Sequence, residues 1–238
     1  MKSTSGVAAA PQAGSQAISY HDTLASGWTQ RYASGGFKRR ADFFMREVLP
    51  KAKVSGEWID VGCGSGFFSR ILARAGAKVL GVDGSDAMIA AAKAFPGAGE
   101  PPRYDVRTVE ELSDAMGRYD GALFLSVLEY LDDPSASLGA VARLLRPGGT
   151  LILSAPNRNS GLRRAQAALR AIAAKSGSKA FPYLASSRNA WSRQELAALA
   201  AGQGLSCQFL LGFDPVAPRP FWPLVSPSLW FAVCVKRA

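Results

Sequence analysis

The chain has few cysteine and histidine residues and lacks a long apolar run. Its 238 residues include one histidine and three cysteines, Cys63, Cys207 and Cys234. An odd number of widely spaced cysteines excludes a disulfide framework and a four-cysteine zinc site, so we expect reduced, mostly buried thiols. No apolar run reaches the roughly 18 to 20 residues of a spanning helix, and the N-terminus lacks the pattern of a secretory signal. We therefore expect a soluble, cytoplasmic protein.

Acidic residues are absent from one part of the chain. Residues 1–154 hold 17 basic and 16 acidic side chains, whereas 155–193 hold eight basic and no acidic ones. The net charge of +10 therefore has a local origin. No helix-turn-helix, zinc-finger or RNP-type motif accompanies it, so nucleic acid is not an expected partner.

The order of sequence patterns predicts one domain. Residues 1–16 are rich in Ser, Ala and Gly, which is typical of a disordered tail, and 17–238 form the expected domain. Two N-terminal helices are expected over 17–49, with a break at 34–36. A capping box, Ser192-Arg-Gln-Glu195, opens a later helix that runs to Ala201.

From residue 57 onward, strand-like runs alternate with helical segments, which indicates parallel βαβ units. The fold class is therefore α/β, with a doubly wound, Rossmann-like, mostly parallel sheet, helices on both faces and a helical cap insertion at about 155–191. The expected strands are 57–61, 78–82, 103–107, 119–126, 150–154, 205–211 and 228–235, and the helices between them include 66–75, 85–94, a short one after 107, and 135–145.

A glycine loop follows the first expected strand, with Gly62, Gly64 and Gly66 after the acid Asp60. Its G-x-G-x-G spacing differs from the G-x-G-x-x-G of dinucleotide enzymes, because the large Phe67 stands where the last glycine would be. Asp83 ends the next strand, where a carboxylate can accept hydrogen bonds from two ribose hydroxyls. A nucleoside with a nearby positive centre fits this loop better than a pyrophosphate.

A series of motifs resembles the class I S-adenosylmethionine-dependent methyltransferases over roughly residues 41–237. The first motif, I-D-V-G-C-G-S-G at 59–66, is followed in the family's order by matching segments at 81–85, 104–111, 118–120, 128–130 and 145–149. The resemblance implies S-adenosyl-L-methionine as the cofactor and S-adenosyl-L-homocysteine as the product.

The same resemblance assigns binding roles to individual residues. The cofactor-binding residues would be Tyr20 and Ser126 near the sulfonium, Arg40 at the carboxylate, Asp60, Gly62, Cys63, Gly64 and Gly66 around the methionine part, Asp83 at the ribose, and Gly84, Met88, Val109 and Glu110 around the adenine. Ordinary core packing is the alternative role for Tyr20, Met88 and Val109. For Arg40 the alternative is a solvated position on the surface.

Within the family, the pattern is closest to the ubiquinone-biosynthesis-type small-molecule O-methyltransferases, through RYDGALFLSVLEYLDDP and SAPNRN. That group commonly has E-x-x-E-H where this chain has Ser126-Val-Leu-Glu129-Tyr130. One carboxylate and a histidine are therefore missing, and we expect no metal ion. His21 is the first candidate for a catalytic base, although a structural histidine is an open alternative, and Glu129 and Tyr130 follow as polar residues near the acceptor.

The basic segment at 155–193 gives information about the methyl acceptor. Its helix at 160–175 places Leu162, Leu169 and Ile172 on one face and Arg163, Arg164 and Arg170 elsewhere. It would cap the acceptor site, contact the inner membrane face peripherally, or pack its apolar side inward. Phe213, Phe221, Trp222 and Trp230 would form a second, aromatic wall.

The leading hypothesis is methyl transfer to a small-molecule acceptor, most simply a hydroxyl of an aromatic, apolar or acidic metabolite. N-methylation of a small amine and a non-catalytic cofactor-binding domain are the alternatives. The G-x-G-x-G spacing disfavours a nicotinamide oxidoreductase, and the oligomeric state stays open.

Overall fold

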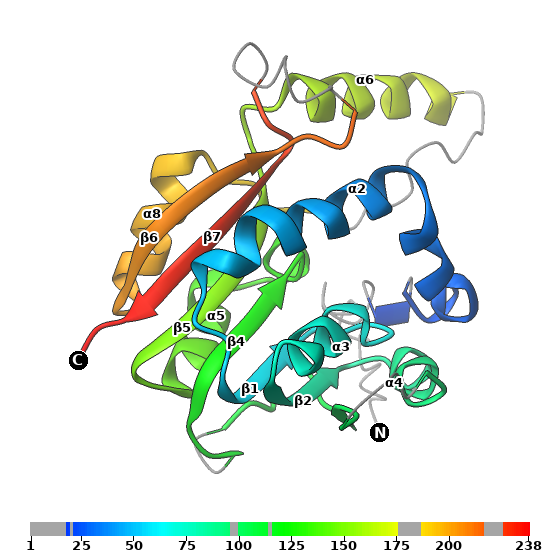
Figure 1. Ribbon diagram of the computed structural model, residues 1–238. Helices are drawn as coiled ribbons and strands as arrows, with labels where there is room; N and C mark the ends of the chain where they lie inside the picture. The colour runs from blue at the N-terminus through cyan, green and yellow to red at the C-terminus, as the bar shows by residue number, and fades with distance from the viewer. Residues whose placement is uncertain (1–17, 20, 96–99, 114–115, 176–186, 217–225) are drawn as a thin grey trace, which may run out of the picture.

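Seven strands form one sheet in the order β3-β2-β1-β4-β5-β7-β6 in the computed structural model (Figure 1). Each neighbouring pair among β3, β2, β1, β4 and β5 is parallel, whereas β7 is antiparallel to both β5 and β6. The mostly parallel, seven-stranded sheet is therefore confirmed. The strands are β1 (Gly56–Val61), β2 (Ala77–Asp83), β3 (Arg103–Val106), β4 (Tyr119–Leu125), β5 (Leu145–Pro156), β6 (Leu205–Phe213) and β7 (Leu229–Lys236).

The structure describes residues 18–19, 21–95, 100–113, 116–175, 187–216 and 226–238. The expected tail at 1–16, Tyr20, Phe221 and Trp222 lie outside these residues. The helices of the described part are α2 (Gly35–Phe43), α3 (Phe67–Arg74), α4 (Asp86–Lys93), α5 (Pro134–Arg143), α6 (Gly161–Lys175) and α8 (Arg193–Gly202), with shorter helical turns at η1 (Ala25–Gly27), η2 (Thr29–Ala33), η3 (Phe44–Val48), η4 (Leu49–Lys51) and η6 (Leu128–Tyr130).

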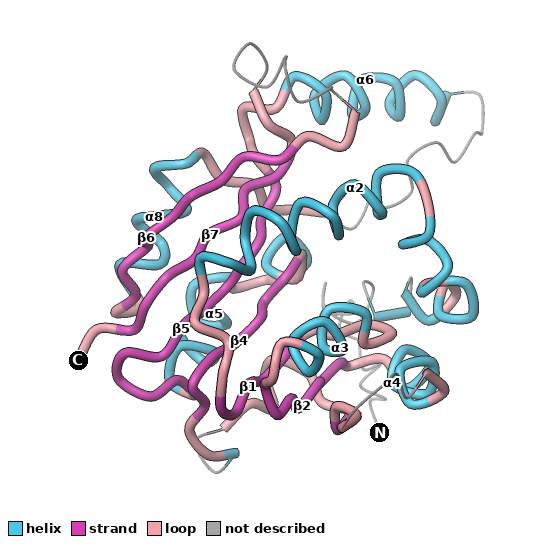
Figure 2. Tube along the Cα trace, in the orientation of Figure 1, coloured by secondary structure: helices cyan, strands magenta, loops and turns pink. Residues whose placement is uncertain are grey.

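Helices cover both faces of the sheet (Figure 2). Successive residues of a strand point to opposite faces, so neighbouring apolar side chains of one strand pack under different helices. In β1, Trp58 packs into the core under α2 and α3, while Ile59 packs into the core under α5 and α8. Both side chains are fully buried. Each face of the sheet therefore has a hydrophobic core of its own.

Local side chains define where several helices begin. The Ser85 hydroxyl accepts a hydrogen bond from the Met88 amide at 3.0 Å, and the Asp133 carboxylate accepts one from the Ala136 amide at 2.9 Å. At α8 the predicted capping box is present, with Ser192 and Glu195 exchanging hydrogen bonds. These bonds satisfy first-turn amides that have no partner within the helix.

The N-terminal region differs from the two expected helices. Before Ser34, the described residues are helical at 18–19 and 21–22 and form the short 3-10 turns η1 and η2 after that, whereas α2 continues into the π-helical turn η3. Ser34 is extended, so the expected break is present. Of the short helix expected after β3, residues 109–111 form a bend and turn, while Met116 is in a 3-10 helical conformation.

Two of the three cysteines form a disulfide, which corrects the expectation of reduced thiols. Cys207 and Cys234 face each other across the antiparallel pair of β6 and β7 and are bonded. Cys63 is a free, buried thiol.

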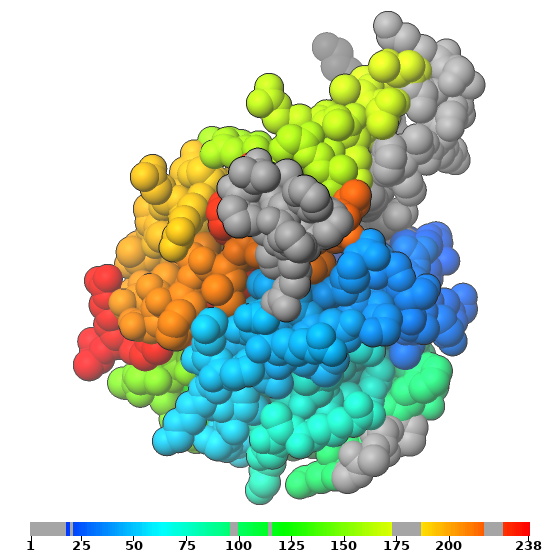
Figure 3. Space-filling model, turned by 45° about the horizontal axis from the view of Figure 1, so that its top comes forward, coloured from blue at the N-terminus to red at the C-terminus, as the bar shows by residue number. Residues whose placement is uncertain are grey.

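Helix α6 lies within the expected cap insertion, at the outer margin of the molecule (Figure 3). Leu169 and Ile172 on this helix are 55% and 66% exposed, so their side of the helix is not packed inward. Among the described helices, none is both long and apolar enough to cross a membrane.

The close approach of Gly121 and Trp58 gives a test of the packing. The two residues are partners in the β1–β4 pair, and a Cβ on Gly121 would lie 2.2 Å from the Trp58 ring. We expect Gly121→Ala to lower the free energy of unfolding by about 1 to 3 kcal/mol, because the core must shift. Gly202→Ala is the control, since a Cβ there meets no atom within 4 Å. Urea denaturation compares the two, and equal loss in both variants would contradict this packing.

Candidate functional site

A cavity of about 560 Å³ opens at the carboxyl ends of β1, β2 and β4. Parallel α/β sheets bind ligands at this edge, because the loops that leave the strands diverge there. Helix α2 and the first turn of α6 contribute further walls, and α6 lies beyond the strand ends in Figure 1.

The glycine loop between β1 and α3 forms one wall. The amides of Gly62 and Cys63 both donate to the Val82 carbonyl, at 2.8 and 3.0 Å, which ties the loop to β2. Gly62 has a φ of 72°, and a Cβ there would lie 2.3 Å from a Val127 methyl group. Only glycine fits this position without strain, and its backbone is left close to the cavity.

Asp83 joins the glycine loop to the loop after β2. Its two carboxylate oxygens accept hydrogen bonds from the amides of Gly64, at 2.8 Å, and Ser85, at 3.0 Å. Burial raises the pKa of Asp83, while the two amides and the nearby His21 lower it. Each carboxylate oxygen can accept a further hydrogen bond, so Asp83 remains able to bind a diol at the cavity wall.

Asp60 and Cys63 line the deeper side of the same wall. The Asp60 carboxylate accepts a hydrogen bond from the Ser69 hydroxyl at 2.6 Å. Burial raises the pKa of Asp60 to about 7, against the effect of this bond. Burial, together with Asp60 and Asp83, also raises the pKa of the Cys63 thiol well above its usual value, so Cys63 is a neutral packing group.

A less polar region lies next to Asp83. Gly84, Met88, Val109 and Glu110 all line the cavity there. Met88 and Val109 are buried, whereas Glu110 is exposed at the rim. A flat apolar group would contact Met88 and Val109 and leave its edge near Glu110.

The other end of the cavity is built around the turn after β4. Ser126 has a φ of 55°, and it is the one non-glycine residue with a positive φ in the described part of the chain. Its amide donates to the Ser154 hydroxyl at 3.0 Å. A left-handed serine is strained, and such strain is typical of functional sites. Here it directs the turn so that η6 carries Glu129 and Tyr130 to the cavity.

Glu129 is an acid buried at the cavity wall. It is 4% exposed, and its Oε2 atom has no hydrogen-bond partner among the described residues. Burial raises the pKa of Glu129 to about 7, against a hydrogen bond from Ser126 and the positive charges of Arg40 and Arg163. A buried carboxyl oxygen with no partner is costly unless a ligand meets it.

Arg40 comes from α2 and enters the cavity between two aromatic rings. Its guanidinium lies 5.6 Å from the Phe68 ring centre and 5.7 Å from that of Phe231, and it donates to the Ser154 hydroxyl at 3.2 Å. Its Nε atom is buried and has no partner in the described structure. Arg40 is therefore held by packing and retains a donor for an anionic ligand.

Three aromatic side chains gather where the two ends of the cavity meet. The His21 ring lies edge-on to Trp28 and to Tyr130, with centroid distances of 5.3 and 5.5 Å. Trp28 also stands over the glycine loop, since a Cβ on Gly64 would lie 3.4 Å from its Nε1. No motif marks Trp28 in the sequence, and it was missed there.

Among the described residues of the cap insertion, those that line the cavity lie at the start of α6. Leu162, Arg163 and Gln166 line it, together with Phe213 from β6 and Leu229 from β7. Arg164 and Arg170 are exposed and lie away from it. Arg163, Arg164 and Arg170 therefore do not share one position at the cavity, as a common role in capping the acceptor site would require.

The structure thus brings nearly all the candidate residues to one cavity. Gly66 is not among the residues that line it, and Tyr20 is outside the described residues. Within the described part of the chain, no group of three or more His, Cys, Asp or Glu residues is placed to hold a metal ion.

Comparison with known proteins agrees with this arrangement. Residues 31–208 match the family model described as a methyltransferase domain. The ubiquinone biosynthesis O-methyltransferase of Xanthomonas campestris pv. campestris is 38% identical over 115 residues, which are 48% of this chain and 46% of that protein. The enzyme of the same name from Alkalilimnicola ehrlichii is 42% identical over 103 residues, 42% of each chain. The chain therefore spans less than half the length of these curated relatives.

Solved structures show the same fold. Magnesium protoporphyrin IX methyltransferase from Synechocystis PCC 6803, solved with bound S-adenosylmethionine, superposes with a TM-score of 0.69 at 20% identity, covering 97% of this chain and 100% of that one. The N-methyltransferase NodS from Bradyrhizobium japonicum WM9, in complex with S-adenosylhomocysteine, has a TM-score of 0.66 at 16% identity, with 94% and 99% covered. Since the family match extends over more than half of the chain, the chain belongs to the class I S-adenosylmethionine-dependent methyltransferases.

Proposed function

We propose that this protein methylates a hydroxyl group of a small acidic or aromatic acceptor, with Glu129 as the general base. The observation that carries the proposal is the Glu129 carboxyl. It is buried, has an oxygen without a partner in the described structure, and lines the same cavity as the glycine loop and Asp83.

The residues of the cavity fit S-adenosylmethionine. Asp83 would accept hydrogen bonds from the ribose hydroxyls, and Met88 and Val109 would contact the adenine. Arg40 has an unused buried donor that suits the carboxylate of the methionine part. Burial raises the pKa of both Asp60 and Asp83, so a nearby cationic group that stabilises their ionised forms would be favoured over a neutral ligand.

When bound, the cofactor supplies a methyl group that is already electrophilic. The chain's own residues orient the acceptor and remove its proton. Ionised Glu129 can take a proton from a hydroxyl on its unpartnered oxygen, while Ser126 bonds the rest of the carboxyl. His21 also lines the cavity, beside Tyr130, and is the second candidate for this base.

The acceptor end of the cavity supports an acidic acceptor. Arg163 lies there and donates to the Ser187 hydroxyl at 3.0 Å, but no carboxylate of the described residues forms an ion pair with it. By contrast, the exposed Arg158 and Arg188 pair with Glu195 and Asp132. Arg163 is thus available to an anionic group, and Phe37, Phe213 and Leu229 supply apolar surface. Transfer to oxygen is favoured by the names of the curated relatives.

Asp83 provides the test of the cofactor site. We expect Asp83→Ala to weaken the binding of S-adenosylmethionine and S-adenosylhomocysteine by about 1.5 to 3 kcal/mol each, because charge-assisted hydrogen bonds are lost. Titration calorimetry measures both affinities. Asp86→Ala is the matched control, since Asp86 is an exposed acid three residues along the chain and does not line the cavity. Unchanged affinity in a folded Asp83→Ala protein would remove Asp83 from the site.

Glu129 provides a pH test of the base. Its pKa is raised to about 7, and a base acts only when it is ionised, so turnover should rise with pH through about 7. We expect Glu129→Gln to lower kcat by about 10² to 10⁴-fold and to abolish this rise, while cofactor affinity stays within about twofold. Methyl transfer is followed across pH by mass spectrometry. A rise that persists in Glu129→Gln but disappears in His21→Asn would assign the base to His21 instead.

Arg163 provides the test of acceptor charge. The acceptors to be compared are hydroxybenzoates, which are anionic, and their methyl esters, which are neutral. Methyl transfer to each compound is measured as the gain of one methyl group. We expect Arg163→Gln to lower kcat/KM about tenfold for the anionic members only, since one charge-assisted contact is lost. Arg164→Gln on the exposed side of α6 should leave both classes unchanged. Equal effects of the two variants would refute a pocket role. Reduced binding to anionic vesicles in Arg164→Gln alone would place the membrane contact on the outer side of the helix.

A further inference from the structure

The segment 187–191, which is the last part of the expected cap insertion, runs along the outer side of the turn η6. The backbone amides of Arg188 and Asn189 both donate to the Glu129 carbonyl, at 2.8 and 3.2 Å. The segment then joins the end of β5, where the Trp191 amide donates to the Pro156 carbonyl at 3.0 Å. It therefore forms a strap between the cap and the turn that carries Glu129.

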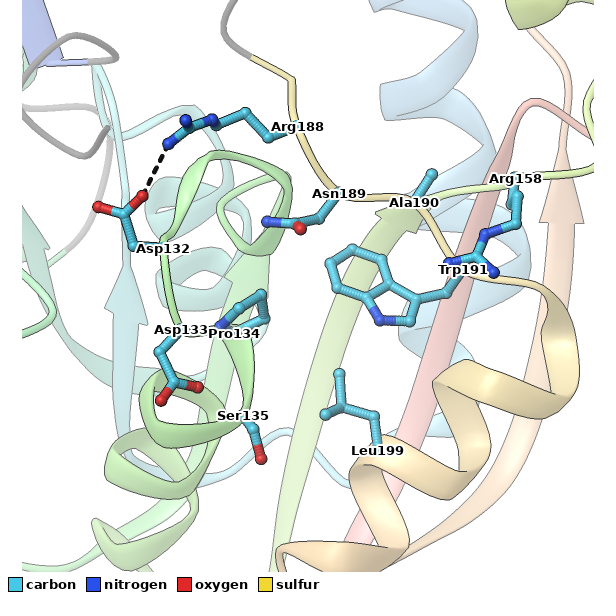
Figure 4. A pocket seen from close by; sticks show the side chains of 10 residues that line it. All are labelled: Asp132, Asp133, Pro134, Ser135, Arg158, Arg188, Asn189, Ala190, Trp191 and Leu199. Carbon is cyan, nitrogen blue, oxygen red and sulfur yellow. Dashed lines mark hydrogen bonds and ion pairs between the residues drawn. The ribbon is translucent and has the colours of Figure 1, made fainter. Parts of the chain in front are cut away.

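Asn189 makes the most extensive contact between the strap and this turn. Its side-chain amide donates to the carbonyls of Leu131, at 2.8 Å, and Leu128, at 3.4 Å. Leu128 and Leu131 are both buried, and the Leu128 carbonyl also accepts a hydrogen bond from the Leu131 amide at 3.4 Å. In Figure 4 the Asn189 side chain points from the strap toward the turn. One side chain thus bridges both ends of the turn that contains Glu129.

Packing alone does not hold the turn from this side. A second cavity, of about 410 Å³, lies outside the strap and is lined by Asn189, Arg188, Trp191 and Leu199 among others (Figure 4). The Arg188–Asp132 ion pair at its rim has both side chains more than half exposed, so it contributes little. Leu128 and Leu131 anchor the turn in the core on its inner side, and the hydrogen bonds of the strap restrain it on the side that faces this second cavity.

The strap is also connected to the acceptor end of the cavity. The Ser187 hydroxyl accepts a hydrogen bond from Arg163, whose helix lines the cavity. A series of contacts thus runs from Arg163 through the strap to the backbone of Glu129.

We propose that Asn189 is a positioning residue for the transfer reaction, which holds the turn 128–131 so that the Glu129 carboxyl is fixed at the cavity wall. This rests on the proposed function, in which Glu129 acts as the base. Asn189 itself does not line the inner cavity, so its effect passes through Glu129. A displacement of about 1 Å in a catalytic group can cost about 10²-fold in rate.

The test compares Asn189→Leu with Arg188→Gln, its neighbour in the strap. Asn189→Leu removes the two donors while keeping the bulk of the side chain. We expect kcat to fall about 10 to 100-fold, with the acceptor KM and the cofactor affinity within about twofold, and faster hydrogen exchange of amides 128–131. Arg188→Gln keeps its backbone bond to Glu129 and should behave as the wild type. Unchanged kcat in Asn189→Leu, or an equal loss in Arg188→Gln, would overturn the proposal.

Asn189→Asp is the second variant, in case Asn189→Leu does not fold. It keeps the shape of the side chain, and when ionised it cannot donate to either carbonyl, so kcat should fall as in Asn189→Leu. A folded Asn189→Asp protein with wild-type kcat would also refute the positioning role.

Combination with Glu129→Gln separates this proposal from the proposed function. If Asn189 acts through Glu129, Asn189→Asp should reduce the residual rate of Glu129→Gln by less than twofold, because the two effects are not additive. Full additivity would place the effect of Asn189 elsewhere. If Glu129→Gln alone retains wild-type kcat, the proposed base is wrong whatever Asn189 does. If Glu129→Gln is inactive and Asn189→Asp is normal, only the positioning role fails.

Discussion

The site depends on the carboxylate of Asp83, which joins the loops after β1 and β2. Its oxygens bind the amides of Gly64 and Ser85, and Ser85 in turn caps α4 through the Met88 amide. One carboxylate therefore aligns the glycine loop and the next helix with the cavity between them. Because two neutral amides do not use all its lone pairs, it is also the natural partner of a hydroxylated ligand. Asp83 thus holds the two loops in place and also lies where a ligand in the cavity could contact it.

The buried charges of the cavity are separated into two regions with different chemistry. Asp60 and Asp83 lie near the glycine loop, where burial raises both pKa values, so a cationic group is favourable there. Glu129 lies at the other end with Arg40 and Arg163 near it. A cofactor with a positive centre suits the first region, and an acidic acceptor with a removable proton suits the second. The aromatic side chains of His21, Trp28 and Tyr130 stand between them.

Features set by nearby residues could be predicted from the sequence, whereas features set by packing between distant segments could not. The glycine loop, the alternation of strands and helices and the cap at Ser192 follow from local motifs. The disulfide could not be predicted, because it depends on the register that places Cys207 opposite Cys234 across β6 and β7, and the spacing of the cysteines does not reveal that register. Trp28 lies between the short turns η1 and η2, where a regular helix was expected, and Asn189 contacts η6, which is distant from it in the sequence.

Helix α6 shows why charge pattern alone left two interpretations open. At its first turn, Leu162, Arg163 and Gln166 line the cavity, so this part belongs to the proposed acceptor site. Farther along, Leu169 and Ile172 are exposed beside the exposed Arg170. The pocket role and the surface role therefore concern different turns of one helix rather than competing for the same residues. An acceptor with an apolar tail could place its reactive end beside Arg163 and lay its tail along the outer turns, so both roles would serve a single substrate class.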